Sequence, residues 1–137
     1  MSTNFEPFRL ENLGKVCVVH VHGECDFANS GMLEGALKSA ARDTFGVVIA
    51  SFVECSFADC SCLGALIRQF KELGTRLMIV APPKSSFRRI LSLTGMGDVL
   101  PVFDELSAAY AVAPLRAQEC VSFADGQPWD VRPWRVA

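Results

Sequence analysis

Apolar runs alternate with amphipathic segments along most of the chain. Residues 16–22, 47–52 and 76–80 are apolar on both alternating faces, which is typical of central strands in a parallel sheet. Between and after these runs, apolar residues recur at the i, i+3, i+4, i+7 spacing of a helix that buries one face. The two helical sets are Leu33, Ala36, Leu37 and Ala40, and then Leu63, Leu66, Ile67 and Phe70.

Capping residues and helix breakers set the ends of these segments. Asn29 or Ser30 can cap the first helix, Phe45-Gly46 ends it, and Gly74 stops the second. Before the first apolar run, the pattern predicts an edge strand at residues 5–10 and a turn at residues 12–14. After the last run it predicts a helix from Pro82-Pro83 to Gly95, with Phe87, Ile90 and Leu91 inward. A short strand at 99–102 and a last helix at 105–113 follow, and this helix is capped by Asp104 and ended by Pro114.

The resulting order is β-β-α-β-α-β-α-β-α. It predicts an α/β fold in one domain, with a mixed, largely parallel sheet of about five strands flanked by about four helices. This domain covers residues 1–114, and residues 115–137 form an extension without helical period that carries Trp129 and Trp134. Large apolar side chains avoid water, so we expect the extension to pack onto the domain or across a homodimer.

Composition narrows the class of protein. The 137 residues carry a formal net charge of -2, which argues against binding nucleic acid through backbone charge. No apolar run approaches the roughly 20 residues of a membrane span, and residues 1–6 lack the features of a signal peptide. The expected location is the cytoplasm.

Six cysteines stand at positions 17, 25, 55, 60, 62 and 120. Disulfide frameworks belong mainly to short secreted chains, so we expect most of these thiols to be reduced. Cys55, Cys60 and Cys62 have C-x4-C-x-C spacing, and with Cys25 and His22 they suggest a metal site. The spacing lacks the C-x2-C pair of ordinary zinc sites, so we expect no metal and no cofactor. His20 and His22 share one strand face, where a structural role is favoured over ligation.

The segment Phe57-Ala58-Asp59-Cys60-Ser61-Cys62-Leu63-Gly64 lies between a buried strand and an amphipathic helix. Binding sites in open α/β sheets gather at the carboxyl ends of strands. Asp59 or Ser61 can cap the helix, whose free N–H groups favour an anion and lower the pKa of a thiol at Cys60 or Cys62. The charge of Asp59 raises the pKa of a neighbouring thiol. Cys60 also has no His/Asp arrangement beside it, which weighs against a role as catalytic nucleophile.

The order of five short motifs resembles the STAS domain family, the bacterial anti-sigma factor antagonists and their relatives, over residues 5–113. The motifs are Gly23-Glu24-Cys25-Asp26, the strand 47–52, residues 57–64, Leu77-Met78-Ile79-Val80 and Leu93-Thr94-Gly95-Met96. The resemblance implies a non-catalytic protein-binding module that acts by partner switching. Its implied partner is an anti-sigma factor that is also an ATP-dependent serine kinase, and this kinase phosphorylates a serine at the start of the second helix.

This chain departs from the family at that serine. The family pattern Asp-Ser-Ser-Gly is here Asp59-Cys60-Ser61-Cys62, so the phosphoacceptor position holds a cysteine. Phosphorylation is thereby put in doubt, although Ser61 is an alternative acceptor. The resemblance implies partner contacts at Glu24, Asp26, Asp59, Cys60, Ser61, Cys62 and Leu63.

Other readings stay open. Within the family, the chain could be the STAS subunit of a lipid-transport ABC system or of a stress-signalling complex. From another class, the cysteine cluster suggests a redox sensor or a metal-binding enzyme. Lys84, Arg88 and Arg89 lie on the polar side of the predicted third helix, where a solvated face or a contact with an acidic partner is expected.

Overall fold

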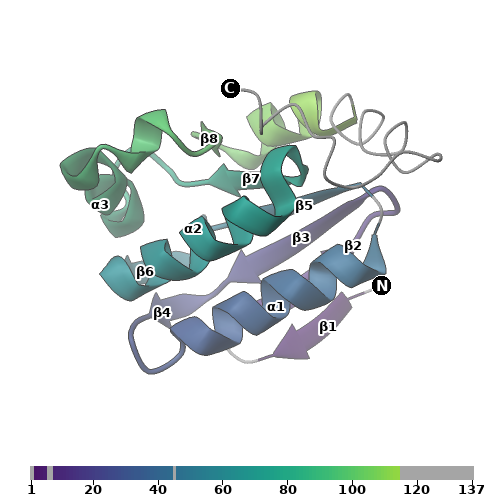
Figure 1. Cartoon of the computed structure of the whole chain (residues 1–137), viewed down its shortest axis with the longest axis horizontal. Coiled ribbons are helices and arrows are strands. Elements are labelled where there is room, and N and C mark those ends of the chain that lie inside the picture. Colours follow the sequence, from purple (N-terminus) through teal and green to yellow (C-terminus); the bar gives the residue numbers. More distant parts are fainter. Residues whose placement is uncertain (1, 6–7, 45, 115–137) are drawn as a thin grey trace.

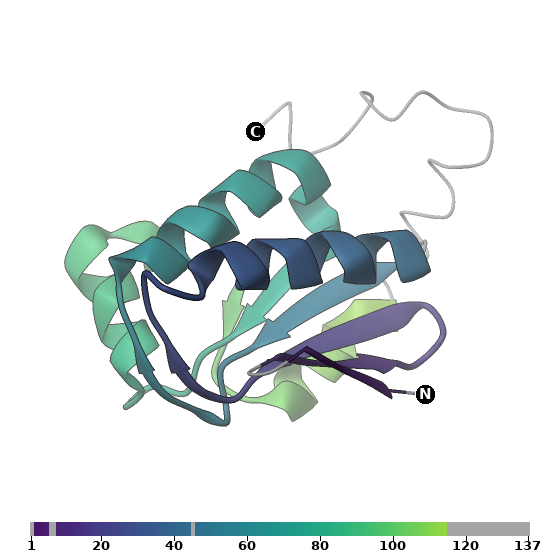
Figure 2. The same ribbon diagram turned by 90° about the horizontal axis from the view of Figure 1, so that it is seen from below.

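The computed structural model describes residues 2–5, 8–44 and 46–114, with side chains from residue 8 onward. The main sheet has the strand order β1-β2-β3-β5-β7-β8, and helices cover both of its faces (Figures 1 and 2). Its strands are β1 Ser2–Phe5, β2 Phe8–Asn12, β3 Val16–Val21, β5 Val47–Ser51, β7 Leu77–Val80 and β8 Val102–Phe103. The N-terminal strands β1, β2 and β3 pair antiparallel, whereas β3, β5, β7 and β8 pair parallel. The predicted mixed, largely parallel sheet is confirmed.

A second, two-stranded sheet was not predicted. It consists of β4 (Gly23–Cys25) and β6 (Cys55–Ala58), which pair parallel. These strands follow β3 and β5, which are themselves neighbours in the main sheet. Gly23 has a φ of 75°, a backbone conformation that favours glycine, and its N–H donates to the carbonyl of Glu54 at 3.2 Å. The two chain segments that pair as β3 and β5 in the main sheet therefore turn away from it and pair again as β4 and β6.

The helices are α1 Ser30–Asp43, α2 Cys60–Leu73, α3 Ser86–Thr94 and a last helix over residues 106–114. Helices α1 and α2 begin and end close to the predicted boundaries. Short 3-10 turns, η1 Gly74–Arg76 and η2 Met96–Asp98, follow α2 and α3. The buried residues of α1 are the predicted ones: Leu33, Ala36, Leu37 and Ala40. Gly95 ends α3 in the left-handed conformation, as expected of a C-terminal glycine.

The core has two parts, one on each face of the main sheet. On one face, α1, α2 and α3 pack against the side chains of β3, β5 and β7 such as Val19, Val48 and Ile79. On the opposite face, Ala109 and Ala113 of the last helix cover Val18, Ile49 and other apolar side chains (Figure 2). Phe52, just after β5, stacks on Phe87 of α3 with ring centroids 4.1 Å apart, which fixes α3 beside the end of β5.

Three predicted boundaries were wrong. The strand expected at 99–102 is a turn over residues 99–101 followed by the two-residue β8, because the N–H groups of Val99 and Leu100 bond back to the carbonyl of Met96. Helix α3 starts at Ser86, since the Ser85 hydroxyl caps it by accepting from the Arg88 N–H at 3.1 Å. Asp104 accepts from the Arg88 guanidinium at 2.8 Å, and the last helix begins at residue 106.

Two sequence predictions fall partly or wholly outside the described residues. The edge strand expected at residues 5–10 corresponds to the end of β1 and most of β2, with residues 6–7 outside. The extension 115–137, with Cys120, Trp129 and Trp134, lies outside altogether.

Candidate functional site

Two surface segments distant in sequence meet at one end of the molecule. One follows β4 and leads into α1, and the other joins β6 to α2. They are neighbours because β4 and β6 pair in parallel, with Glu24 opposite Phe57 and Cys25 opposite Ala58. The carboxyl ends of both strands thus lie at the same edge, where ligand and partner sites of α/β proteins are commonly found.

Asp59 joins the two segments. One carboxylate oxygen accepts a hydrogen bond from the backbone N–H of Ser61 at 3.0 Å and a second from the Ser61 hydroxyl, which caps α2. The other oxygen accepts from the backbone N–H of Phe27 at 3.1 Å. The backbone N–H of Asp59 donates in turn to the carbonyl of Cys25 at 3.2 Å.

These hydrogen bonds favour the ionised carboxylate. The bond from the Ser61 hydroxyl is the main reason that the pKa of Asp59 lies below its ordinary value, and the backbone bonds act in the same direction. A negatively charged Asp59 therefore holds both the start of α2 and the loop before α1.

The loop before α1 is held by its own polar side chains. Asn29 accepts from the N–H of Asp26 at 2.8 Å and donates to the carbonyl of Glu24 at 3.0 Å. Asp26 accepts from the N–H of Ala28 at 3.0 Å. This bonding occupies polar groups of the loop and leaves the ring of Phe27 outside, 84% exposed. Phe57 on the paired strand β6 is exposed as well, so apolar area lies on both segments.

A disulfide between Cys25 and Cys62 lies beneath these segments. Their Cα atoms are 6.5 Å apart and the residues are separated by 37 positions. Both side chains are fully buried. This bond was not predicted, and it forms because the parallel pairing of β4 and β6 brings Cys25 onto the first turn of α2. It does not contradict the expectation that most cysteines are reduced, since three of the five described cysteines are free. Cys17, Cys55 and Cys60 are free thiols.

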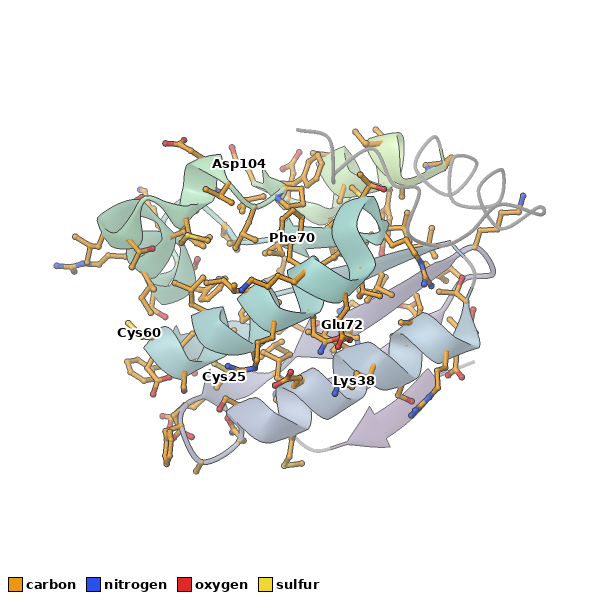
Figure 3. All side chains as sticks on the ribbon, in the orientation of Figure 1. Cys25, Lys38, Cys60, Phe70, Glu72 and Asp104 are labelled. Atoms are coloured by element: carbon orange, nitrogen blue, oxygen red, sulfur yellow. A yellow bond between two sulfur atoms is a disulfide. The ribbon has the colours of Figure 1, made fainter. Side chains whose placement is uncertain are left out.

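The predicted contact residues lie at different depths. Glu24 and Cys60 are exposed, and Asp26, Asp59 and Ser61 are partly exposed. Figure 3 shows Cys60 at the outer end of α2, pointing away from the sheet. Cys62 and Leu63 are buried and support the surface from inside.

Sequence reasoning missed two exposed aromatic residues at this place, Phe27 and Phe57. The signal for Phe27 was an aromatic residue inside a polar turn, between Asp26 and Asn29. We call the exposed and partly exposed set the loop surface. Its members are Glu24, Asp26, Phe27, Phe57, Asp59, Cys60 and Ser61.

The remaining candidate residues divide into buried or hydrogen-bonded positions and exposed ones. His20 is buried and lies 2.9 Å from a carboxylate oxygen of Glu11, whereas His22 is exposed. Arg88 donates to the carbonyl of Ala81 at 2.6 Å as well as to Asp104, and Lys84 and Arg89 are exposed. Within residues 8–44 and 46–114, no group of three His, Cys, Asp or Glu side chains is arranged to hold a metal ion.

The free thiols differ in environment. Burial raises the pKa of Cys17 to about 11, helped by the charge of Asp43. Burial also raises the pKa of Cys55, whose thiol donates to the carbonyl of Phe57 at 3.1 Å. Both thiols are therefore protonated, weak nucleophiles at neutral pH.

A sequence model of the STAS domain matches residues 8–109. The chain belongs to the STAS domain family. The match spans the elements from β2 to the last helix, so both segments of the loop surface lie inside the family's domain. No curated protein matches the sequence.

Solved structures agree with the family. An anti-sigma factor antagonist from Mycobacterium paratuberculosis is 25% identical and superposes with a TM-score of 0.70, covering 78% of this STAS protein and 92% of that chain. The phosphorylated Bacillus cell fate determinant SpoIIAA is 23% identical with a TM-score of 0.57, covering 77% and 98%. A sulfate transporter family protein from Wolinella succinogenes is 22% identical with a TM-score of 0.62, covering 76% and 88%. In the described part of this chain, every helix is too short or too polar to cross a membrane.

Proposed function

We propose that this STAS protein is a non-catalytic regulatory module that binds an anti-sigma factor of the ATP-binding, serine-kinase type and thereby frees a sigma factor. The similarity to an anti-sigma factor antagonist supports the class of partner. The observation that carries the proposal for this chain is the loop surface, where Phe27 stands in water on a loop that Asp59 and Asn29 hold in place.

The chemistry of the loop surface defines what the partner must offer. Phe27 and Phe57 supply apolar area, because they are 84% and 47% exposed. Aromatic side chains of this kind are frequent anchors of protein interfaces. Glu24 is paired with Phe57 across β4 and β6, and Asp26 directly precedes Phe27 in the chain, so two carboxylates accompany the rings in these segments. A complementary partner has an apolar pocket bordered by arginine or lysine side chains.

Regulation of the complex differs from the family pattern in this proposal. The position that resembles the phosphoacceptor serine is Cys60, whose exposed thiol is not a substrate for a serine kinase. The neighbouring Ser61 hydroxyl is engaged with the Asp59 carboxylate. Release by phosphorylation, which adds a charge of about -1.5 to -2, is therefore not expected here.

The proposal is tested by titrating the purified chain against the ATP-binding anti-sigma factors of its source organism. We expect Phe27→Ala to weaken binding at least tenfold, since a buried aromatic anchor contributes about 2 kcal/mol or more. Its thermal midpoint should stay unchanged, because the ring already lies in water.

Leu13→Ala is the matched control, since Leu13 is 50% exposed but lies between β2 and β3, at the end of the sheet opposite β4 and β6. Binding that is equally strong in wild type, Phe27→Ala and Leu13→Ala would place the interface elsewhere. Absence of binding to every such anti-sigma factor would overturn the proposed class of partner.

A further inference from the structure

The Cys25–Cys62 disulfide joins the two halves of the loop surface at their base. Cys25 is the last residue of β4, and Cys62 lies in the first turn of α2. The exposed Phe27 follows Cys25 by two positions, and the exposed Cys60 precedes Cys62 by two positions. Among the described residues, this bond is the one covalent link between the two segments.

The same backbone also accommodates the dithiol form. The Cys62 sulfur lies 2.9 Å from the carbonyl oxygen of Cys25, so a reduced Cys62 thiol has a hydrogen-bond acceptor in place. Reduced cysteines pack as small apolar side chains, and both positions belong to the main core. The fold can therefore hold either redox form of this pair.

The neighbouring thiols do not compete for the pair. Cys55 lies next to the backbone of Cys25, but its raised pKa keeps it protonated at neutral pH. Cys60 precedes Cys62 by two positions, and residues two apart on a helix face different directions. Exchange inside the protein is thus disfavoured. Because both side chains are buried, an external thiol reaches the pair when the loop before α1 or the first turn of α2 opens locally.

We propose that Cys25 and Cys62 are a redox-sensitive pair that sets the affinity of the loop surface for its protein partner, an inference that rests on the proposed function. A thiolate of an external dithiol attacks one sulfur of the bond, forms a mixed disulfide and releases the other cysteine, which takes up a proton. The second thiol of the dithiol then displaces the first cysteine. Two electrons and two protons pass to the protein, and the dithiol leaves as its own disulfide.

The oxidised form is the tighter binder. With the bond intact, the loop that carries Phe27 is tied to α2 by a covalent link as well as by the hydrogen bonds of Asp59. Without it, only the hydrogen bonds remain, and the loop gains freedom that binding must remove. Preorganisation of this kind increases affinity because less ordering is needed on association. Reducing cytoplasmic conditions, where disulfides are mostly transient, would then lower the affinity.

The test compares oxidised and dithiothreitol-reduced samples of the full chain. Alkylation followed by intact-mass measurement should show two additional thiols after reduction and their loss on reoxidation. Titration against the same anti-sigma factor should show about tenfold weaker binding for the reduced form, as expected from lost preorganisation. The double variant Cys25→Ala/Cys62→Ala should match the reduced form and be insensitive to dithiothreitol, whereas Cys60→Ala should keep the oxidised-to-reduced ratio.

Amide NMR spectra detect the effect of reduction on the loop surface in the absence of a partner. Reduction should shift and broaden the signals of residues 25–29 and 59–63 and leave those of β3 and β5 unchanged. Unchanged spectra, or equal affinity of the two forms, would overturn the redox inference while leaving the proposed function intact. Absence of binding in both forms would overturn the proposed function, and the spectra would still decide whether the bond orders the loop surface.

Discussion

Reduction of the Cys25–Cys62 disulfide should lower the stability of the domain by a measurable amount. The bond closes a loop between residues 37 positions apart. For a loop of this length, the chain entropy that a cross-link removes from the unfolded state is equivalent to about 4 kcal/mol. Reduction changes no side-chain carbon and leaves an acceptor for the Cys62 thiol, so little native-state energy offsets this loss.

The expected shift of the thermal midpoint follows from that free energy. At about 4 °C per kcal/mol for a domain of this size, the reduced protein should unfold about 15 °C below the oxidised one. Circular dichroism melts of the oxidised and dithiothreitol-treated wild type measure the difference directly. The Cys25→Ala/Cys62→Ala variant should melt near the reduced wild type and show no response to the reductant.

Cys60→Ala serves as the control, because Cys60 is exposed and unpaired. This variant should keep both the wild-type midpoint and the full response to reductant. A difference below about 3 °C between oxidised and reduced wild type would refute the argument, since the unfolded chain would then gain almost no freedom from reduction.

Three further predictions address single side chains. The hydrogen bonds of Asp59 lower its pKa below the ordinary value of 3.8. The stability that the ionised carboxylate contributes is therefore complete above pH 3.8 and is lost as the pH falls through the lower pKa of the folded protein. The difference in thermal midpoint between wild type and Asp59→Asn should shrink as the pH falls below 3.8. Incubation with an ATP-binding anti-sigma kinase and ATP should add no phosphate by intact mass, whereas Cys60→Ser should gain one, and stoichiometric phosphate on the wild type would contradict this. Arg76 donates to the carbonyls of Ala41, Thr44 and Gly46, so Arg76→Met should cost about 2 kcal/mol in urea unfolding, and a loss below about 0.5 kcal/mol would contradict its role.

The sequence predicts the parts of the fold that local patterns determine. The spacing of Leu33, Ala36, Leu37 and Ala40 identifies the buried face of α1, because a helix returns to the same side every three to four residues. Asp59 is predicted as a possible cap for the same local reason: its carboxylate bonds a backbone N–H two residues away.

The parts that were missed depend on contacts between distant residues. β4 and β6 are too short for an alternating pattern, and each is a strand only because it pairs with the other. The disulfide follows from that pairing, and spacing in the sequence does not reveal which cysteines meet. The exposure of Phe27 depends equally on Asp59, which lies 32 positions further along the chain.

The parallel pairing of β4 and β6 also determines when the loop surface appears during synthesis. Glu24 and Phe27 leave the ribosome early, but the residues that hold and complete the surface, Phe57 and Asp59, follow only after α1 and β5. A nascent or prematurely terminated chain that ends before α2 has one segment of the surface without its support. Under the proposed function, such unfinished chains should bind a partner more weakly than the complete protein, because Asp59 is not there to hold the loop that carries Phe27.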